Sequence, residues 1–297
     1  MFGAENHCGD FAFRTKIPLR TTLVPAIYDR ILWYGREKSS VKFRRLFLKR
    51  ETGRDTQFTW LHLFDGTRRR MTADELDGQV DLPLSSRVFR LTDLVSAGRT
   101  ESCVFEFPLD GRKFYPGGGK SWKTNPSGME RLIRADRVMA PGDVPAYVFF
   151  ADDYPYSELD NVWSDTQGAS DRLYAVQTNT KVIERCLLMT SDPGDLVLDP
   201  TCGSGTTAYV AEQWGRRWIT IDTSRVALAL ARTRLMAAKY RYYLMTDTPD
   251  GQRKEAELTE APPLGSTEGD IRKGFVYERV PHATLGSIAQ NPDIREG

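Results

Sequence analysis

The order of apolar and polar positions in the second half of the chain predicts a strand, a glycine turn, a helix and a second strand. The run 196–198 is apolar without alternation, which is typical of a parallel strand buried on both faces. Residues 206–214 place apolar side chains at helical spacing, and Gly215 follows where a glycine often ends a helix. A second apolar run, 218–221, leads to Asp222. The pattern predicts a β-α-β unit of an α/β fold.

Similar patterns predict elements on both sides of this unit. Strands are expected at 11–14 and 28–34, and helices at 181–190 and from Ser224 to about residue 240. The segment 247–270 is rich in Pro, Gly, Thr and charge, so we expect a loop or linker there.

Two carboxylates and two glycines follow the predicted strands. Asp199 ends the first strand, Gly203 and Gly205 follow it, and Asp222 ends the second. Ligands of parallel sheets bind at the carboxyl ends of the strands, and an acid after the second strand suits the two hydroxyls of a ribose. The loop is not G-x-G-x-x-G, so a dinucleotide site is poorly supported. The run GGGKS at 117–121 lacks the first glycine of a phosphate-binding loop.

The segment D-P-T-C-G-S-G-T-T at 199–207 resembles the cofactor motif of DNA amino-methyltransferases that use S-adenosylmethionine. The segment 175–188, around Gln177, is similar to the other cofactor motif of that family, and it precedes the glycine loop as in the permuted β group. The tail 269–281 resembles long, type III-like adenine methylases. The resemblance implies a Rossmann-like methyltransferase sheet with an inserted target-recognition region.

The same resemblance implies a set of cofactor-binding residues. Asp199 would lie beside the methionine end, the loop 203–206 under it, and Asp222 on the ribose. The full set is Gln177, Asp199, Pro200, Gly203, Ser204, Gly205, Thr206 and Asp222. From the residues alone, Asp199 could instead cap the following helix and Asp222 could simply end its strand.

The amino-acid composition excludes some classes of protein but does not identify the function. The chain has 297 residues and a net charge of +1, which neither requires nor excludes DNA. No apolar run is long enough to span a membrane, and the N-terminus has no secretory signal pattern. The four cysteines are scattered without a C-x-x-C pair, which favours reduced thiols, a cytoplasmic location and no metal site.

Basic and aromatic residues are interleaved from about residue 42 to residue 137, a pattern that suits phosphates and unstacked bases. The candidate DNA contacts are Arg68, Arg69, Lys120 and Lys123. A solvated surface with core aromatics is the alternative. Ser127 is expected to cap a helix with Glu130 as its capping-box partner, and this helix could contact DNA or simply pack.

The family's amine-activating tetrapeptide, D-P-P-Y, does not occur in this sequence. The nearest string, Asp153-Tyr154-Pro155-Tyr156, follows the middle segment instead of preceding residue 11. We therefore assign no catalytic residue and expect a fragment that lacks the amino-terminal catalytic part.

The expected organisation has four parts. Residues 1–40 would be a remnant of the catalytic half of the sheet, 41–160 the recognition region, 161–245 the cofactor half, and 246–297 a linker and extension. The leading hypothesis is a DNA adenine-N6 methyltransferase acting on duplex DNA, with a restriction subunit as a possible partner. The alternatives are a non-catalytic module that needs a chain carrying D-P-P-Y, and a nicotinamide dehydrogenase.

Overall fold

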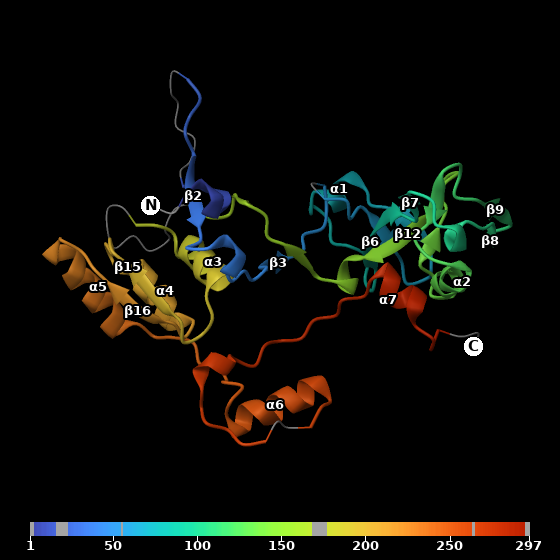
Figure 1. Cartoon of the computed structure of the whole chain (residues 1–297). Coiled ribbons are helices and arrows are strands. Elements are labelled where there is room, and N and C mark those ends of the chain that lie inside the picture. The colour runs from blue at the N-terminus through green and yellow to red at the C-terminus, as the bar shows by residue number, and fades with distance from the viewer. Residues whose placement is uncertain (1–2, 16–22, 55, 168–176, 263–264, 295–297) are drawn as a thin grey trace. The chain divides into compact units, whose positions relative to one another are not determined.

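The computed structural model describes the chain except for residues 1–2, 16–22, 55, 168–176, 263–264 and 295–297. Its contacts divide the chain into two units (Figure 1). Unit 1 comprises Met1–Phe47 and Glu158–Arg279, and unit 2 comprises Leu48–Ser157 and Val280–Gly297. Residues 280–294 are grouped with unit 2, and the expected division into four parts stays a prediction.

Unit 1 is built from short strands and four helices among its described residues. The strands are β1 His7–Arg14, β2 Tyr28–Tyr34, β14 Val162–Trp163, β15 Leu196–Asp199 and β16 Arg217–Thr220. The helices are α3 Thr180–Thr190, α4 Thr206–Gln213, α5 Arg225–Ala237 and α6 Pro249–Thr259, with 3-10 turns at Ala4–Asn6, Lys38–Ser40 and Ile271–Lys273. Strands β3 Phe47–Lys49 and β13 Tyr156–Glu158 lie where the chain passes between the units.

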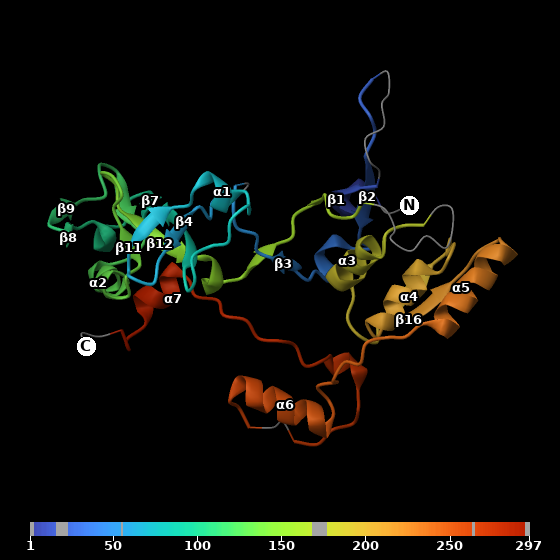
Figure 2. The ribbon, with the colours of Figure 1, turned by 180° about the vertical axis from the view of Figure 1, so that it is seen from behind.

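The predicted β-α-β unit is present as β15, α4 and β16. The two strands are parallel, with Leu198 opposite Ile219, and α4 lies along them (Figures 1 and 2). Val197 and Trp218 point to the helix side, where they pack with Val210 of α4.

The expectation that residues 196–198 are buried on both faces is wrong. Leu196 is 55% exposed and Leu198 is 60% exposed. The helices α3 and α4 cover one face of this strand pair, and the other face has no cover in the described part of the chain.

A second sheet of unit 1 has the order β14-β1-β2, with β1 parallel to β14 and antiparallel to β2. Phe11, Ile31 and Trp163 from its strands pack against Val182 of α3. Because Leu187 of the same helix packs against α4, α3 serves both clusters of unit 1. This confirms the predicted helix and its apolar side.

Unit 2 is mainly antiparallel. Its strands are β4 Trp60–His62, β5 Arg68–Arg70, β6 Arg87–Asp93, β7 Val95–Ala97, β8 Phe107–Leu109, β9 Arg112–Phe114, β10 Lys120–Trp122, β11 Val138–Met139 and β12 Ala146–Phe150. The helices are α1 Ala73–Leu76, α2 Pro126–Arg134 and α7 Leu285–Gln290, with 3-10 turns at Glu101–Cys103 and Ala151–Asp153. Five strands form a sheet in the order β11-β12-β6-β4-β5.

The main core of unit 2 lies under α2. Trp122, Met129 and Leu132 are almost fully buried there, and Ala289 of α7 joins them. Helices α2 and α7 lie side by side in both views (Figures 1 and 2). The buried side of α2 therefore packs against its own unit, and its exposed side carries Arg134.

The N-cap prediction for α2 is wrong by two residues. Asn125 is the N-cap, because its side chain accepts the N–H of Gly128, and Pro126 occupies the first helical position. Proline suits that position since the missing N–H would have no helical partner there.

The prediction of a loop at 247–270 is also wrong, since α6 occupies Pro249–Thr259. Thr248 caps this helix through the N–H of Gly251. The residues after Gly251 are mostly strong helix formers, and their summed propensity outweighs the turn signals.

Candidate functional site

The glycine loop joins the end of β15 to the start of α4. Gly205 is the N-cap of α4 and has a φ of 74°, in the left-handed region. A Cβ on Gly205 would lie 2.8 Å from the Cβ of Ala231 in α5. Both the backbone angle and the close approach of α5 thus require a glycine at this position.

Asp222 ties this loop to the neighbouring strand. Its Oδ2 accepts the N–H of Gly203 at 2.9 Å, and its Oδ1 accepts the N–H of Ser224 at 2.8 Å. The N–H groups of Ser224 and Gly203 hold the pKa of this carboxyl below its usual value. Each carboxylate oxygen has two lone pairs, so the group can still accept a ligand hydroxyl.

Asp199 stands at the end of the adjacent strand. Its Oδ1 accepts the N–H of Thr201 at 3.0 Å, within a turn that includes the exposed Pro200. It does not cap α4, because Gly205 occupies the N-cap. The structure therefore places Asp199 and Asp222 at the same end of two paired parallel strands.

A residue outside the sequence motif, Arg234, also binds the loop. Arg234 of α5 donates from Nη1 to Thr206 Oγ1 at 3.0 Å and to Ser204 Oγ at 3.4 Å. Ser204 and Thr206 are 3% and 6% exposed, so their hydroxyls face the interior and fix the loop. Arg234 lies 28 positions from Thr206, too far for any local pattern to connect them.

Gln177 lies two residues before Asn179, the N-cap of α3, and is partly buried. The preceding part of its motif, Ala175-Val176, lies outside the described residues. The role of Gln177 stays a prediction.

The string Asp153-Tyr154-Pro155-Tyr156 is used for the structure of unit 2. Asp153 is 4% exposed, and its two oxygens accept from Arg137 Nη1 and Nη2. It also accepts the N–H of Phe150 at 2.9 Å. These bonds are all to residues of unit 2, so the carboxylate supports the structure of that unit.

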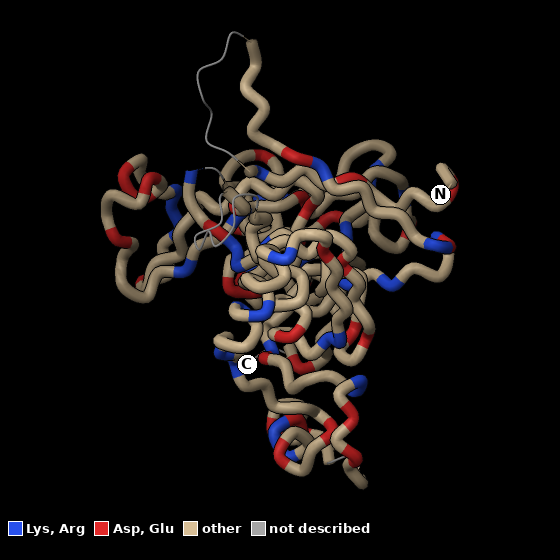
Figure 3. The backbone as a smooth tube through the Cα atoms, turned by 90° about the vertical axis from the view of Figure 1, so that its left-hand side faces the viewer, with Lys and Arg blue, Asp and Glu red and all other residues tan. Residues whose placement is uncertain are grey.

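Most basic side chains of the segment 42–137 are paired with acids. Figure 3 shows Lys and Arg interspersed with Asp and Glu along the backbone. Arg68 donates to Asp136 and lies over the ring of Phe89, so it supports the sheet. Arg69 makes two hydrogen bonds of 2.7 Å with the buried Glu75.

Lys120 and Lys123 differ from these arginines. Both are exposed, and neither makes an ion pair with another described residue. Lys120 begins β10 after Gly117–Gly119, so the GGGKS run leads into a strand. A phosphate loop of the helix-linked kind is therefore absent at this position.

Among the described residues, no group of three or more His, Cys, Asp or Glu side chains could hold a metal ion. Within the same residues, no helix has the length and apolar character needed to cross a membrane.

The sequence model of a family described as DNA methylase, of the N6/N4 type, matches residues 26–233. The match spans the glycine loop, both strand-end carboxylates and the part of unit 2 at residues 48–157. The chain belongs to this family of DNA amino-methyltransferases. Together with the β15-α4-β16 unit, this confirms the resemblance and the predicted α/β methyltransferase fold.

Curated relatives match parts of the chain. The type II methyltransferase M.EcaI of Enterobacter cloacae is 30% identical over 119 residues, which are 38% of this chain and 26% of the relative. The type II methyltransferase M2.DpnII of Streptococcus pneumoniae is 37% identical over 84 residues, or 27% of this chain and 31% of the relative. The chain thus spans about a quarter to a third of the length of these relatives.

Two solved structures have weaker similarity. The complex of M1.HpyAVI with S-adenosylmethionine has a TM-score of 0.24 and 19% identity, over 31% of this chain and 50% of that one. The cytosine-N4-specific PvuII DNA methyltransferase has a TM-score of 0.26 and 19% identity, over 40% and 49%.

Proposed function

We propose that this chain takes part in methyl transfer from S-adenosylmethionine to the exocyclic amine of a base in duplex DNA. One observation carries the proposal: in a member of the DNA methylase family, the loop 203–206 follows the strand that ends at Asp199 and is held by Asp222, just past the end of the paired parallel strand. Adenine N6 is the proposed target, because the tail 269–281 resembles adenine methylases. Cytosine N4 is the alternative product.

The proposed cofactor contacts follow from the geometry of the strand ends. Asp222 would accept the ribose hydroxyls with its remaining lone pairs, and Asp199 with Pro200 would border the methionine end. The loop 203–206 would lie beneath the cofactor, and Gln177 would contact it from before α3. The cofactor supplies an activated methyl group on a sulfonium. The residues of this chain would hold and orient the cofactor, and correct positioning of the reacting groups is most of what a methyl transfer requires.

The target amine also needs a group that removes its proton and holds its lone pair towards the methyl group. The sequence contains no D-P-P-Y, and Asp153 of the nearest string is held in internal bonds. We propose that a segment carrying this group, in cis or on a partner chain, joins unit 1 to form the active site. A restriction subunit is a second proposed partner.

The open face of the strand pair supports the proposal of a further segment. Leu198 and Ile219 are register partners on this face and are 60% and 50% exposed. Leu196 and Ile221 continue the same face and are 55% and 52% exposed. A parallel sheet is normally covered on both faces, so an apolar face of this kind suits a packed neighbour.

The test is incorporation of tritiated methyl groups into unmethylated DNA, followed by nucleoside analysis. The chain alone should transfer almost nothing, and addition of the D-P-P-Y segment of a β-group relative should give N6-methyladenine. Rapid turnover by the chain alone would contradict the need for a further segment. Binding of cofactor and DNA without transfer in any combination would favour the alternative, a non-catalytic module. We also propose a cytoplasmic location, with which four free cysteines are compatible.

A further inference from the structure

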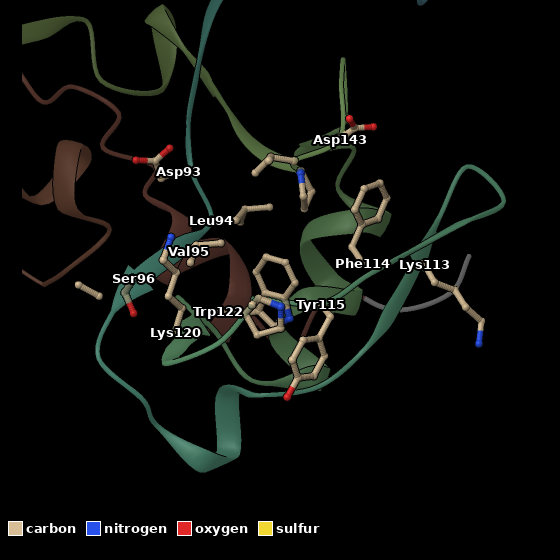
Figure 4. A pocket seen from close by; sticks show the side chains of 15 residues that line it. Asp93, Leu94, Val95, Ser96, Lys113, Phe114, Tyr115, Lys120, Trp122 and Asp143 are labelled. Atoms are coloured by element: carbon tan, nitrogen blue, oxygen red, sulfur yellow. The ribbon is translucent and has the colours of Figure 1, made fainter.

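Unit 2 contains a cavity of about 620 Å³ that the proposed methyl transfer does not explain (Figure 4). It lies between the β7–β10 pair, the loop that follows β9 and the turn at 143–145. The volume is within the range of about 300–1,000 Å³ that is usual for small-ligand sites. All of its lining residues belong to unit 2, so the cavity is complete within that unit.

An aromatic ring stands at the rim of this cavity. Tyr115 is 56% exposed, and its hydroxyl makes no hydrogen bond with another described residue. Its neighbours Phe114 and Pro116 are both buried, and Phe114 packs in the core with Trp122. The backbone on each side of Tyr115 is therefore anchored, and the ring is held out where a flat ligand can stack on it.

Opposite charges line the same cavity without neutralising each other. Lys120 and Asp93 are both exposed lining residues, and neither has an ion pair in the described part of the chain. Asp143, by contrast, is paired with Arg112 at 3.0 Å. The cavity thus offers one available cation, one available carboxylate and one aromatic face.

This combination matches a nucleotide. An ammonium binds a phosphate, an aromatic ring stacks on a base, and a carboxylate accepts an exocyclic amino group. We propose that the cavity receives one unstacked nucleotide of the bound DNA, with its base on Tyr115, its phosphate at Lys120 and its amino group at Asp93. The proposal rests on the proposed function, because it assumes that DNA is the ligand of unit 2.

The proposal predicts a preference for an extrahelical base that carries an amino group. The probe is a short fluorescent duplex with a single bulged adenine, compared with the same duplex carrying a bulged thymine, a bulged abasic site or no bulge. Stacking of one base is worth about 5- to 150-fold in affinity, so the adenine bulge should bind tighter than the paired duplex by a factor in this range. Asp93→Ala, which removes the acceptor, should reduce the preference for adenine over thymine.

Variants of Tyr115 test whether the extrahelical base stacks on the ring of this residue. Tyr115→Ala should bring the affinity for the adenine bulge down to that for the paired duplex, and Tyr115→Phe should keep the difference. Phe64→Ala is the matched control, because Phe64 is an aromatic residue of the same unit that is 89% exposed and does not line the cavity. Circular dichroism of each variant checks that the unit remains folded.

The outcomes separate this proposal from the proposed function. Salt-sensitive binding to paired duplex without any preference for the bulge would overturn the nucleotide site and leave the function standing. A preference that survives Tyr115→Ala would also overturn it, since the base would then bind elsewhere. Absence of binding to any of these duplexes at low salt would overturn both.

Discussion

The backbone N–H of Gly203 donates to the carboxylate of Asp222 at 2.9 Å, so the acid that ends one strand holds the loop that follows its neighbour. The two residues are 19 positions apart and are joined through α4. The bond fixes the distance between loop and strand end before any ligand binds. Preorganisation of this kind lowers the cost of binding.

The close approach of α5 to the loop predicts a steric effect at Gly205. Gly205→Ala should lower the free energy of unfolding by more than the ~1–2 kcal/mol expected for a left-handed backbone alone, because the new Cβ would meet Ala231 at 2.8 Å. Gly269→Ala is the control, since Gly269 has a φ of 71° and no atom within 4 Å of an added Cβ. Urea unfolding measures both, and equal losses would contradict the contact.

Arg234 should act on the cofactor through the loop. Arg234→Ala removes the bonds to Thr206 and Ser204 and leaves these two buried hydroxyls with their mutual contact at 3.4 Å. We expect S-adenosylmethionine to bind about 5- to 30-fold more weakly, the equivalent of ~1–2 kcal/mol. Arg232→Ala on the exposed side of the same helix is the control. If the two variants bind equally well in calorimetry, the loop does not depend on Arg234.

The available lysines should carry the salt dependence of DNA binding. The logarithm of the affinity should fall with the logarithm of salt concentration, and each phosphate contact contributes about 0.9 to the slope. A double change, Lys120→Ala with Lys123→Ala, should reduce the slope by that amount for each lost contact. Lys239→Ala in unit 1 removes an exposed lysine and is the control. An unchanged slope in fluorescence anisotropy would mean that DNA contacts other residues.

The ion pair between Arg69 and the buried Glu75 predicts a pH effect on unit 2. Arg69 donates two hydrogen bonds to Glu75 and lowers the pKa of that carboxyl from 4.5 to about 2. The stability from this pair is present above pH 4.5 and is lost as the pH falls towards 2.

Glu75→Gln should therefore lower the free energy of unfolding at pH 7 by ~1–3 kcal/mol. The difference from the wild type should shrink between pH 4.5 and about 2. Glu106→Gln is the control, because that residue makes an exposed pair with Lys113. A difference that is constant with pH would show that lost packing, not the charged pair, is responsible.

Local patterns in the sequence predicted the elements whose residues determine them locally. Hydrophobic spacing indicated β15, α4 and β16, and Ser224 caps α5 as expected. Hydrophobic spacing did not predict elements whose formation depends on tertiary contacts. Helix α7 has only six residues and gains its stability by packing on α2, which no local spacing could reveal.

The basic residues of unit 2 also show that the sequence does not reveal the tertiary contacts of a side chain. A run of arginines suggested a DNA-binding surface, but Arg68 binds Asp136, 68 positions away. Lys120 and Lys123 have the same charge and remain available in the described part of the chain. Sequence gives the number of basic residues, whereas their partners depend on the fold. The position of the glycine loop could be predicted because a sequence motif marks it. The contact of Arg234 with this loop could not be predicted, because Arg234 lies on another helix.

Binding of S-adenosylmethionine at the strand-end site of unit 1 can be measured by isothermal titration calorimetry. The wild-type chain should bind one cofactor, and Asp222→Ala should weaken binding by ~1–3 kcal/mol, as expected for the loss of a hydrogen-bonding charged group. Asp250→Ala, which removes an exposed carboxylate of α6, should leave the affinity unchanged. Absence of binding to the wild type, or an affinity that Asp222→Ala does not change, would show that this site does not hold the cofactor.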